Sequence, residues 1–207
     1  MIPFSPFLCV ITDEAICPVS LAEEALKGGA AMIQLRHKSA SGSQLFSWAV
    51  AIRKMCQQYQ ALCIINDRVD IALASDADGV HLGQQDMPAA IARKIMGNNC
   101  IIGVSTSSIE EAIQAEEDGA DYIGFGHIYP TSSKEKNNPP LGIETLQKVA
   151  ALISLPIVAI GGINQKNAAL IISSGASGVA VIAAVSQTDK PSSATLNLVC
   201  AINSKKL

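Results

Sequence analysis

Short apolar segments alternate with longer segments of helical period along almost the whole chain, and this alternation constrains the fold most strongly. The apolar segments are bounded by Gly, Pro or Asp and fall at residues 7–11, 31–35, 62–65, 79–82, 100–104, 122–125, 156–160 and 178–182. Helix-compatible patterns lie between or after them, at residues 21–27, 44–59, 70–75, 88–96, 109–118, 143–153, 165–173 and 192–202. Eight such pairs predict a parallel α/β sheet covered by helices.

A weak internal repeat favours a closed barrel over an open sheet. A helix end, a small residue and an apolar strand recur at residues 29–33, 76–80, 119–123 and 175–179. These would open the second, fourth, sixth and eighth strands, as expected of equivalent units placed around a ring. The sequence therefore predicts a single-domain TIM (β/α)8 barrel over residues 1–207 and argues against its rival, a doubly wound open sheet of the flavodoxin type.

Charge and hydropathy limit the partners of the chain. The net charge is −3, and the Lys and Arg residues are scattered, so the sequence lacks the basic footprint that holds nucleic acid. The longest apolar stretch, around residues 149–163, contains Ser154 and Pro156 and is too short to span a bilayer. The N-terminus has no basic region of the secretory kind. We expect a soluble, cytoplasmic protein that binds neither nucleic acid nor membrane, and the oligomeric state stays open, a homo-oligomer included.

Three polar side chains alternate where the second predicted strand ends. In a barrel, the residues that follow the strands face one mouth, where the active site lies. Gln34, Arg36 and Lys38 are two residues apart in an extended run, so their side chains point the same way. Two cations in one row suit a polyanion such as pyrophosphate. An isolated pair of this kind is as often a solvated strand end, but acids on the next strands favour binding.

Two carboxylates follow the third and fourth predicted strands. Asp67 closes the third strand and Asp86 comes after the fourth, so a barrel would bring them together from neighbouring strands. Such a pair can bind one Mg²⁺ ion beside phosphate oxygens, although either residue alone reads equally well as a helix N-cap. Asn66 adjoins Asp67 and offers an amide to the edge of a heterocycle.

The last strands carry signs of a second phosphate site. Residues 131–134 combine hydroxyl groups with a cation at the start of a long polar loop that runs to residue 142. Gly161 and Gly162 after the seventh strand, and Ile182 and Ala183 after the eighth, match the phosphate site that the last two loops of a barrel form. Each feature alone is an ordinary loop or turn, but together they predict a phosphate separate from the pyrophosphate.

The three histidines differ in what they predict. His81 lies inside a strand, where a structural or indirect role is the more common one. His37 should point away from its neighbours Arg36 and Lys38. His127 ends the sixth strand at the mouth, where it would act as a general acid or base or else only orient the following loop.

In order along the chain, these segments resemble the successive motifs of the thiamine-phosphate synthase family. The matching segments are residues 34–38, 65–70, 78–84 with Asp86, 103–105, 126–134 and 159–163. The resemblance spans nearly the whole chain and implies an Mg²⁺-dependent transferase of thiamine biosynthesis. Its substrates would be the small phosphorylated molecules 4-amino-5-hydroxymethyl-2-methylpyrimidine pyrophosphate and 4-methyl-5-(2-hydroxyethyl)thiazole phosphate, and its products thiamine phosphate and pyrophosphate.

The resemblance also implies roles for individual residues. Asp67 and Asp86 would hold Mg²⁺. The pyrimidine pyrophosphate would contact Gln34, Arg36, Lys38, Asn66, Ser105 and Lys134. The thiazole phosphate would be framed by Thr131, Ser133, Gly162, Ile182 and Ala183. In the family, the pyrimidine C–O bond ionises before the thiazole nitrogen attacks, and the residues expected to take part in catalysis here are Arg36, Lys38, Ser105 and Lys134, with His127 as a further candidate.

Three positions depart from the family pattern. Ala183 stands where many members have Ser, Ser107 stands where many have His, and His127 follows Gly126 where Gly-Pro is frequent. A histidine there is similar to the catalytic one of the related thiazole tautomerase, which typically lacks the paired acids and the complete Gln-Arg-Lys row. This chain keeps both features, which favours the synthase. A tautomerase-like isomerase that uses His127, a non-catalytic barrel that binds thiamine precursors and an unrelated sugar-phosphate isomerase are the alternatives.

Overall fold

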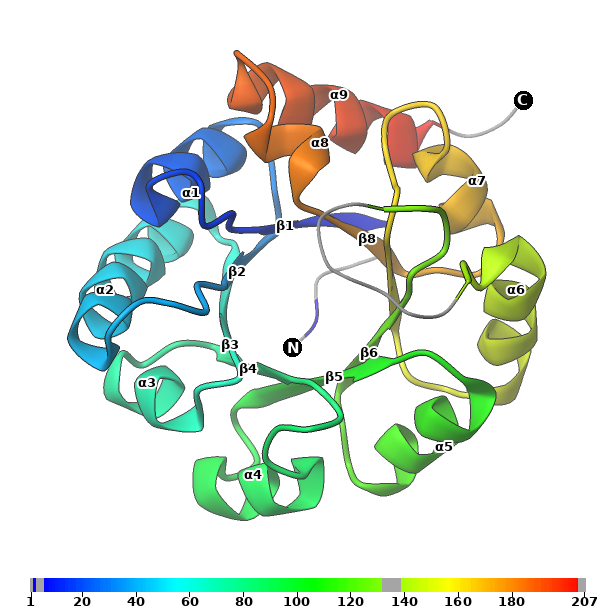
Figure 1. Cartoon of the computed structure of the whole chain (residues 1–207), viewed down its shortest axis with the longest axis horizontal. Coiled ribbons are helices and arrows are strands. Elements are labelled where there is room, and N and C mark those ends of the chain that lie inside the picture. The colour runs from blue at the N-terminus through cyan, green and yellow to red at the C-terminus, as the bar shows by residue number, and fades with distance from the viewer. Residues whose placement is uncertain (1, 3–5, 132–138, 205–207) are drawn as a thin grey trace.

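Eight parallel strands close into a barrel in the computed structural model, which describes residues 2, 6–131 and 139–204 (Figure 1). Each strand pairs with the next along the chain, and the last pairs with the first. The predicted barrel is therefore confirmed, and the open-sheet alternative is wrong because the sheet closes on itself. The strands are β1 Phe7–Ile11, β2 Met32–Leu35, β3 Leu62–Asn66, β4 Gly79–Leu82, β5 Ile101–Thr106, β6 Tyr122–Gly126, β7 Ile157–Ile160 and β8 Gly178–Val181.

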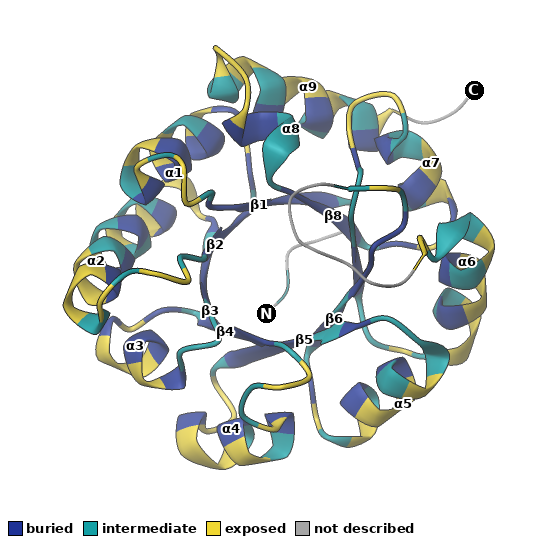
Figure 2. Ribbon diagram, in the orientation of Figure 1, coloured by how far each residue is buried: buried dark blue, intermediate teal, exposed yellow. Residues whose placement is uncertain are grey.

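Helices form a ring around the barrel and turn their buried faces toward it (Figure 2). Their bounds are α1 Pro18–Lys27, α2 Gly42–Tyr59, α3 Val69–Ala74, α4 Ala89–Met96, α5 Ile109–Glu117, α6 Gly142–Leu152, α7 Ala168–Ser173, α8 Ala183–Ser186 and α9 Pro191–Asn203. The predicted α1 started too late, because Pro18 occupies the first turn, where its missing N–H is harmless. Within the described residues, no helix is long and apolar enough to cross a membrane.

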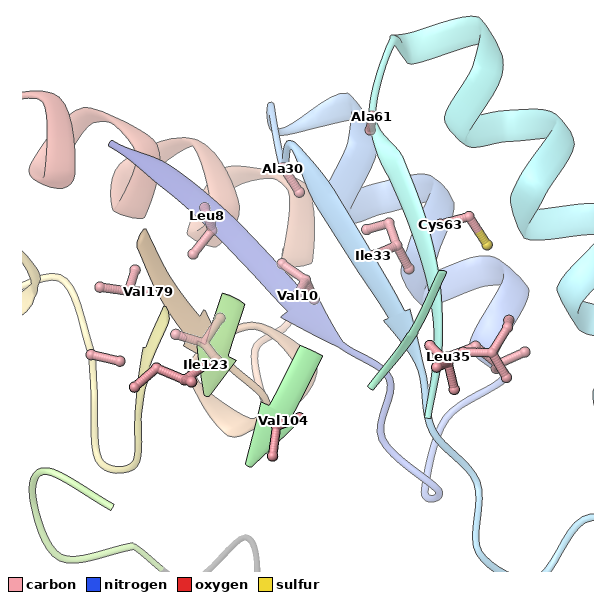
Figure 3. Close-up of a cluster of buried hydrophobic side chains, with 14 of the residues drawn as sticks. Leu8, Val10, Ala30, Ile33, Leu35, Ala61, Cys63, Val104, Ile123 and Val179 are labelled. Atoms are coloured by element: carbon pink, nitrogen blue, oxygen red, sulfur yellow. The ribbon is translucent and has the colours of Figure 1, made fainter. Parts of the chain in front are cut away.

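The core has two layers because side chains alternate across each strand. Outward-facing residues such as Leu8, Val10 and Ile33 pack between the strands and the helices (Figure 3). Inward-facing residues fill the barrel itself, and these include Phe7, Cys9, Met32, Ile64, Tyr122 and Val158. Parallel strands buried on both faces explain why the strands read as continuous apolar runs in the sequence.

The internal repeat corresponds to one turn geometry used before alternate strands. The first residue of each copy has a positive φ, between 50° and 104°, and the alanine that follows donates its N–H to a helix carbonyl five residues earlier. This arrangement ends a helix and favours glycine, which has no Cβ to clash. The positive-φ residues are Gly29, Asp76, Gly119 and Gly175.

Partly exposed ion pairs lie at the opposite end of the barrel, where strands begin. Asp78 accepts a hydrogen bond of 2.7 Å from the backbone N–H of Cys63 and lies 3.3 Å from Arg53. Asp121 repeats the contact two strand–helix units further on, where it accepts from the Ile102 N–H at 2.7 Å and pairs with Arg93 at 2.5 Å. Polar groups at this end serve the stability of a barrel, whereas those at the other end serve its chemistry.

Candidate active site

A cavity of about 520 Å³ opens at the carboxyl end of the strands. Eleven of the residues singled out from the sequence line it, and they come from all sides of the barrel. They are Gln34, Arg36, Lys38, Asn66, Asp86, Ser105, His127, Thr131, Gly162, Ile182 and Ala183. Asp67 joins them through its contacts with Lys38 and Asp86. Ser133 and Lys134 lie outside the described residues.

The segment after β2 is held in its extended conformation by the loop after β1. The Thr12 hydroxyl accepts a hydrogen bond of 2.8 Å from the Arg36 N–H and donates one of 2.9 Å to the Arg36 carbonyl. The Glu14 carboxylate accepts from the Lys38 N–H at 3.1 Å and lies 3.5 Å from the Arg36 guanidinium. Both cations therefore enter the cavity from a fixed backbone.

His37 faces away from the cavity. Its ring lies against the Trp48 ring of α2, with centroids 5.1 Å apart, and its Nδ1 is 3.8 Å from a Glu14 oxygen. Alternation along the extended segment thus separates His37 from the two cations, as the sequence predicted.

Two carboxylates meet between the ends of β3 and β4. Asp67 has φ of 64°, a conformation that Asp tolerates better than most residues, and its N–H donates to the His81 carbonyl at 2.8 Å. Asp86 folds back so that its carboxylate accepts from the Gly83 N–H at 2.7 Å. A Cβ at Gly83 would lie 2.9 Å from that oxygen, so a larger residue there would displace the Asp86 carboxylate. The Asp67 and Asp86 side chains share a hydrogen bond.

The pKa values of the two carboxyl groups are shifted in opposite directions. Burial pushes the pKa of Asp67 upward, but the Lys38 ammonium and the hydrogen bond with Asp86 outweigh it, and the net pKa is lowered. For Asp86, burial and then the neighbouring Asp67 raise the pKa. Two partly buried carboxylates that compete for a proton are electrostatically suited to a divalent cation.

The donor set of this pair fits Mg²⁺. Both side chains offer hard oxygen ligands, and Mg²⁺ in proteins is commonly held by one or two carboxylates with phosphate oxygens and water completing its shell. In the ranges that the structure describes, no group of three or more His, Cys, Asp and Glu side chains is placed to hold a metal. An Mg²⁺ ion at Asp67 and Asp86 would therefore take its remaining ligands from substrate and water.

Glycines shape the opposite side of the cavity. Gly161 and Gly162 have φ of 101° and 65°, and both pack against the segment after β6. A Cβ at Gly161 would lie 2.3 Å from the Cβ of His127, and one at Gly162 would lie 2.5 Å from the Pro130 carbonyl oxygen. The backbone after β7 therefore comes close to the cavity in a way that only glycine permits.

The short helix α8 follows β8 directly, with Ile182 as its N-cap and Ala183 as its first residue. Sequence reasoning did not predict α8, because four residues are too few to show a helical period. A short extra helix after the eighth strand is the usual companion of the phosphate site in barrels of this kind.

His127 is 7% exposed and lines the cavity between these two sides. Its carbonyl oxygen accepts a hydrogen bond of 2.9 Å from the Leu141 N–H, which joins the two described ends of the segment between β6 and α6. The imidazole is thus placed beside any ligand that fills the cavity.

Two residues that line the cavity were not predicted from the sequence. Tyr122 is a buried residue inside β6 that reads as an ordinary core aromatic, and the one available signal was a glycine at its register partner, Gly103. Glu111 reads as a first-turn acid of α5, but its carboxylate accepts from the N–H of Ser107 at 2.6 Å and from its hydroxyl at 3.0 Å. Ser105 lies inside β5, which runs to Thr106, rather than after it.

Comparison with known proteins agrees with this geometry. The sequence pattern of the thiamine monophosphate synthase family matches residues 8–185. The thiamine-phosphate synthase of Chlorobium limicola is 60% identical over 199 residues, which cover 96% of this chain and 95% of that protein. The thiamine-phosphate synthase of Methanospirillum hungatei is 47% identical and covers 86% of this chain and 88% of its own.

Solved structures give the same result. The structure of a thiamine phosphate pyrophosphorylase from Pyrococcus furiosus superposes with a TM-score of 0.88 at 43% identity, covering 95% of each chain. A 3-hexulose-6-phosphate synthase superposes with a TM-score of 0.71 at 19% identity, over 95% of this chain and 99% of its own, which shows a shared fold.

Proposed function

Because this chain belongs to the thiamine monophosphate synthase family, we propose that its barrel mouth condenses a pyrimidine pyrophosphate with a thiazole phosphate. The enzyme is a transferase that makes thiamine phosphate and releases pyrophosphate. The substrates are those named above, and we take residues 1–207 as one catalytic domain.

The pyrimidine pyrophosphate would occupy the side of the cavity formed by β2 to β5. Arg36 can grip phosphate oxygens through two N–H groups, and Lys38 adds a point charge. Both oppose the negative charge that grows on the leaving pyrophosphate when the bond breaks. We assign the same substrate to Gln34, Asn66, Ser105 and Lys134.

Asp67 and Asp86 would hold Mg²⁺ beside this pyrophosphate. When bound, the ion would neutralise phosphate charge and so make pyrophosphate a better leaving group. The shared hydrogen bond of the two carboxylates, and the opposite shifts of their pKa values, support this assignment.

The thiazole phosphate would occupy the side formed by β6 to β8. Its phosphate would be framed by Thr131, Ser133, Gly162, Ile182 and Ala183. Ala183 has no hydroxyl to offer, so its contribution would be its backbone N–H, and the close approach of the backbone at Gly162 supports the same mode of binding.

The reaction needs no proton transfer to or from the attacking atom. The C–O bond between the pyrimidine methylene and pyrophosphate breaks, and its electron pair leaves with pyrophosphate. The lone pair of the thiazole nitrogen then forms the new C–N bond, and the positive charge stays on the thiazolium ring. Catalysis therefore rests on placing two substrates and stabilising a leaving group.

The arrangement of the cavity is the main support for this proposal. A single cavity is lined by the acid and cation cluster on one side and by the glycines after β7 and the backbone after β8 on the other. Two phosphorylated substrates bound at these sides would face each other across it.

The test is a product assay on the purified protein. We expect thiamine phosphate and pyrophosphate to form in equal amounts when both substrates and Mg²⁺ are present, and neither to form when one substrate is left out. Binding of both substrates without any turnover would overturn the proposal in favour of a non-catalytic thiamine-precursor barrel.

A further inference from the structure

A row of hydrogen-bonded side chains lies inside the barrel and lines the cavity. His81 of β4 is 7% exposed; its Nδ1 lies 2.9 Å from the Tyr122 hydroxyl, and its Nε2 lies 2.9 Å from the Ser105 hydroxyl. The Tyr122 hydroxyl also hydrogen-bonds with the Gln34 side chain. The two ends of the row, Gln34 and Ser105, are residues that the proposed function assigns to the pyrimidine pyrophosphate.

The barrel keeps space for this row by having glycines on β5 and β6. A Cβ at Gly103 would lie 2.1–2.5 Å from atoms of the Tyr122 ring, and one at Gly124 would lie 2.8 Å from the His81 ring. Glycine inside a strand weakens the strand and often marks a place where something must approach closely. What approaches here is the pair of rings that connects the two substrate residues.

The surroundings of the row make its hydrogen bonds directional. Apolar side chains inside the barrel, among them Cys9, Met32 and Ile64, lie beside the row, and buried polar atoms in such surroundings are stabilised by hydrogen-bond partners. A neutral imidazole has one donor and one acceptor nitrogen, and each hydroxyl has one proton to donate. Burial raises the pKa of Tyr122 well above its usual value, so its hydroxyl keeps that proton.

A neutral imidazole allows two directions for the hydrogen bonds of the row. In the first, Gln34 donates to Tyr122, Tyr122 donates to Nδ1 of His81, and Nε2–H donates to Ser105. The Ser105 proton is then free to point into the cavity. In the second, every bond is reversed, and Ser105 gives its proton to His81 and presents only lone pairs. Phosphate oxygens accept hydrogen bonds, so only the first direction makes Ser105 useful to a pyrophosphate.

We propose that His81 is a positioning residue whose Nε2–H holds Ser105 as a hydrogen-bond donor to the pyrimidine pyrophosphate. Gln34 contacts Tyr122, and Tyr122 contacts Nδ1 of His81. These two residues therefore set the direction of the hydrogen bonds in the row. The proposal rests on the proposed function for the identity of the ligand, but the state of the row is a property of the protein without substrate.

The first test therefore needs no turnover. The chain has three histidines, so ¹⁵N NMR of protein labelled at histidine resolves few ring signals, and the signals that vanish in His81→Gln belong to His81. We expect a proton on Nε2 in the wild type and a smaller fraction of molecules with that proton in Tyr122→Phe, which removes the partner of Nδ1. An Nδ1–H tautomer, with no proton on Nε2, at neutral pH would overturn the proposal.

The second test is a double-mutant cycle on the pyrimidine substrate. His81→Ala should lower kcat about 10–100-fold, the usual effect of removing a residue that orients a ligand-binding group, and leave KM for the thiazole phosphate nearly unchanged. His81→Gln, which keeps an N–H donor, should recover part of the loss. In a Ser105→Ala background the His81 substitution should cost less than about twofold, since the effect passes through Ser105.

Full additivity of the His81 and Ser105 effects would overturn the proposal. Thr195→Val is the matched control, because Thr195 is a fully buried hydroxyl of α9 outside the cavity, and it should leave kcat unchanged. If the wild type makes no thiamine phosphate, the proposed function fails, while the tautomer measurement still decides the state of the row.

Discussion

The Lys38 ammonium lies against the Asp67 carboxylate at the mouth of the barrel. Lys38 is 53% exposed at its side chain and Asp67 is 19% exposed, so the contact involves a mobile cation and a partly buried anion. In the substrate-free protein, Lys38 supplies the positive charge that Mg²⁺ would bring to Asp67. The same ammonium is then available to the pyrophosphate once the metal binds.

Lys38→Met should therefore change two affinities in opposite directions. Without substrate, Mg²⁺ should bind about two- to fivefold more tightly, the range expected when an exposed ion pair stops competing. Inorganic pyrophosphate with Mg²⁺ present should bind at least about tenfold more weakly, because one charge-assisted hydrogen bond is lost. Calorimetric titration with MgCl₂ and then with pyrophosphate measures both. Lys27→Met is the control, since Lys27 pairs with Glu23 and Glu24 on the outer surface.

An unchanged or weaker affinity for Mg²⁺ in Lys38→Met would show that Lys38 does not compete with the metal for Asp67. The role of Lys38 in binding pyrophosphate would then be tested by the pyrophosphate titration alone.

His127→Asn separates the synthase from the tautomerase-like alternative. The condensation needs no general acid or base, so we expect thiamine phosphate formation to fall by less than about tenfold, through altered packing of the cavity. Loss of a general acid or base would instead reduce the rate by about 10²–10⁴-fold. We also expect the wild type not to isomerise thiazole carboxylate phosphate, and isomerisation that disappears in His127→Asn would establish the alternative activity.

Gly103→Ala should destabilise the barrel. The new Cβ would meet the Tyr122 ring at 2.1 Å, and overpacking of this kind typically lowers the free energy of unfolding by about 1–3 kcal/mol. Denaturant unfolding monitored by circular dichroism measures the loss. The matched control is Gly42→Ala at the start of α2, where the nearest atom is 3.5 Å away on the flexible Arg68 side chain. That substitution should be neutral or stabilising, and equal effects of the two would contradict the packing argument.

The fold was largely predictable from the sequence because a barrel repeats its local rules. Each buried strand reads as an apolar run, and the turn before alternate strands uses a left-handed residue that favours glycine, as at Gly29 and Gly175. Short elements were not predictable in this way. The helix α8 is one turn long, and β5 extends to Thr106 because strand ends depend on pairing with β6 rather than on local sequence.

Much of the candidate site could also be located from the sequence, because barrel topology turns a position after a strand into a position at the mouth. Asp67 and Asp86 meet for that reason. Tyr122 could not be found, since it reads as an ordinary core aromatic at the start of β6 and contacts His81 from inside the barrel. Glu111 could not be found either, because its contact with Ser107 depends on how α5 meets β5.

The most direct test of an Mg²⁺-dependent condensation is the rate of thiamine phosphate formation, measured as a function of Mg²⁺ concentration in the wild type, Asp67→Asn and Asp86→Asn. We expect no product in the presence of a chelator. In each variant the rate should fall by about 10²-fold or more, as expected when the groups that stabilise a leaving anion are removed. Asp70→Asn, an exposed acid paired with Arg68, should behave like the wild type. Product formation that persists without divalent metal and in both variants would contradict a role for Mg²⁺, Asp67 and Asp86 in the reaction.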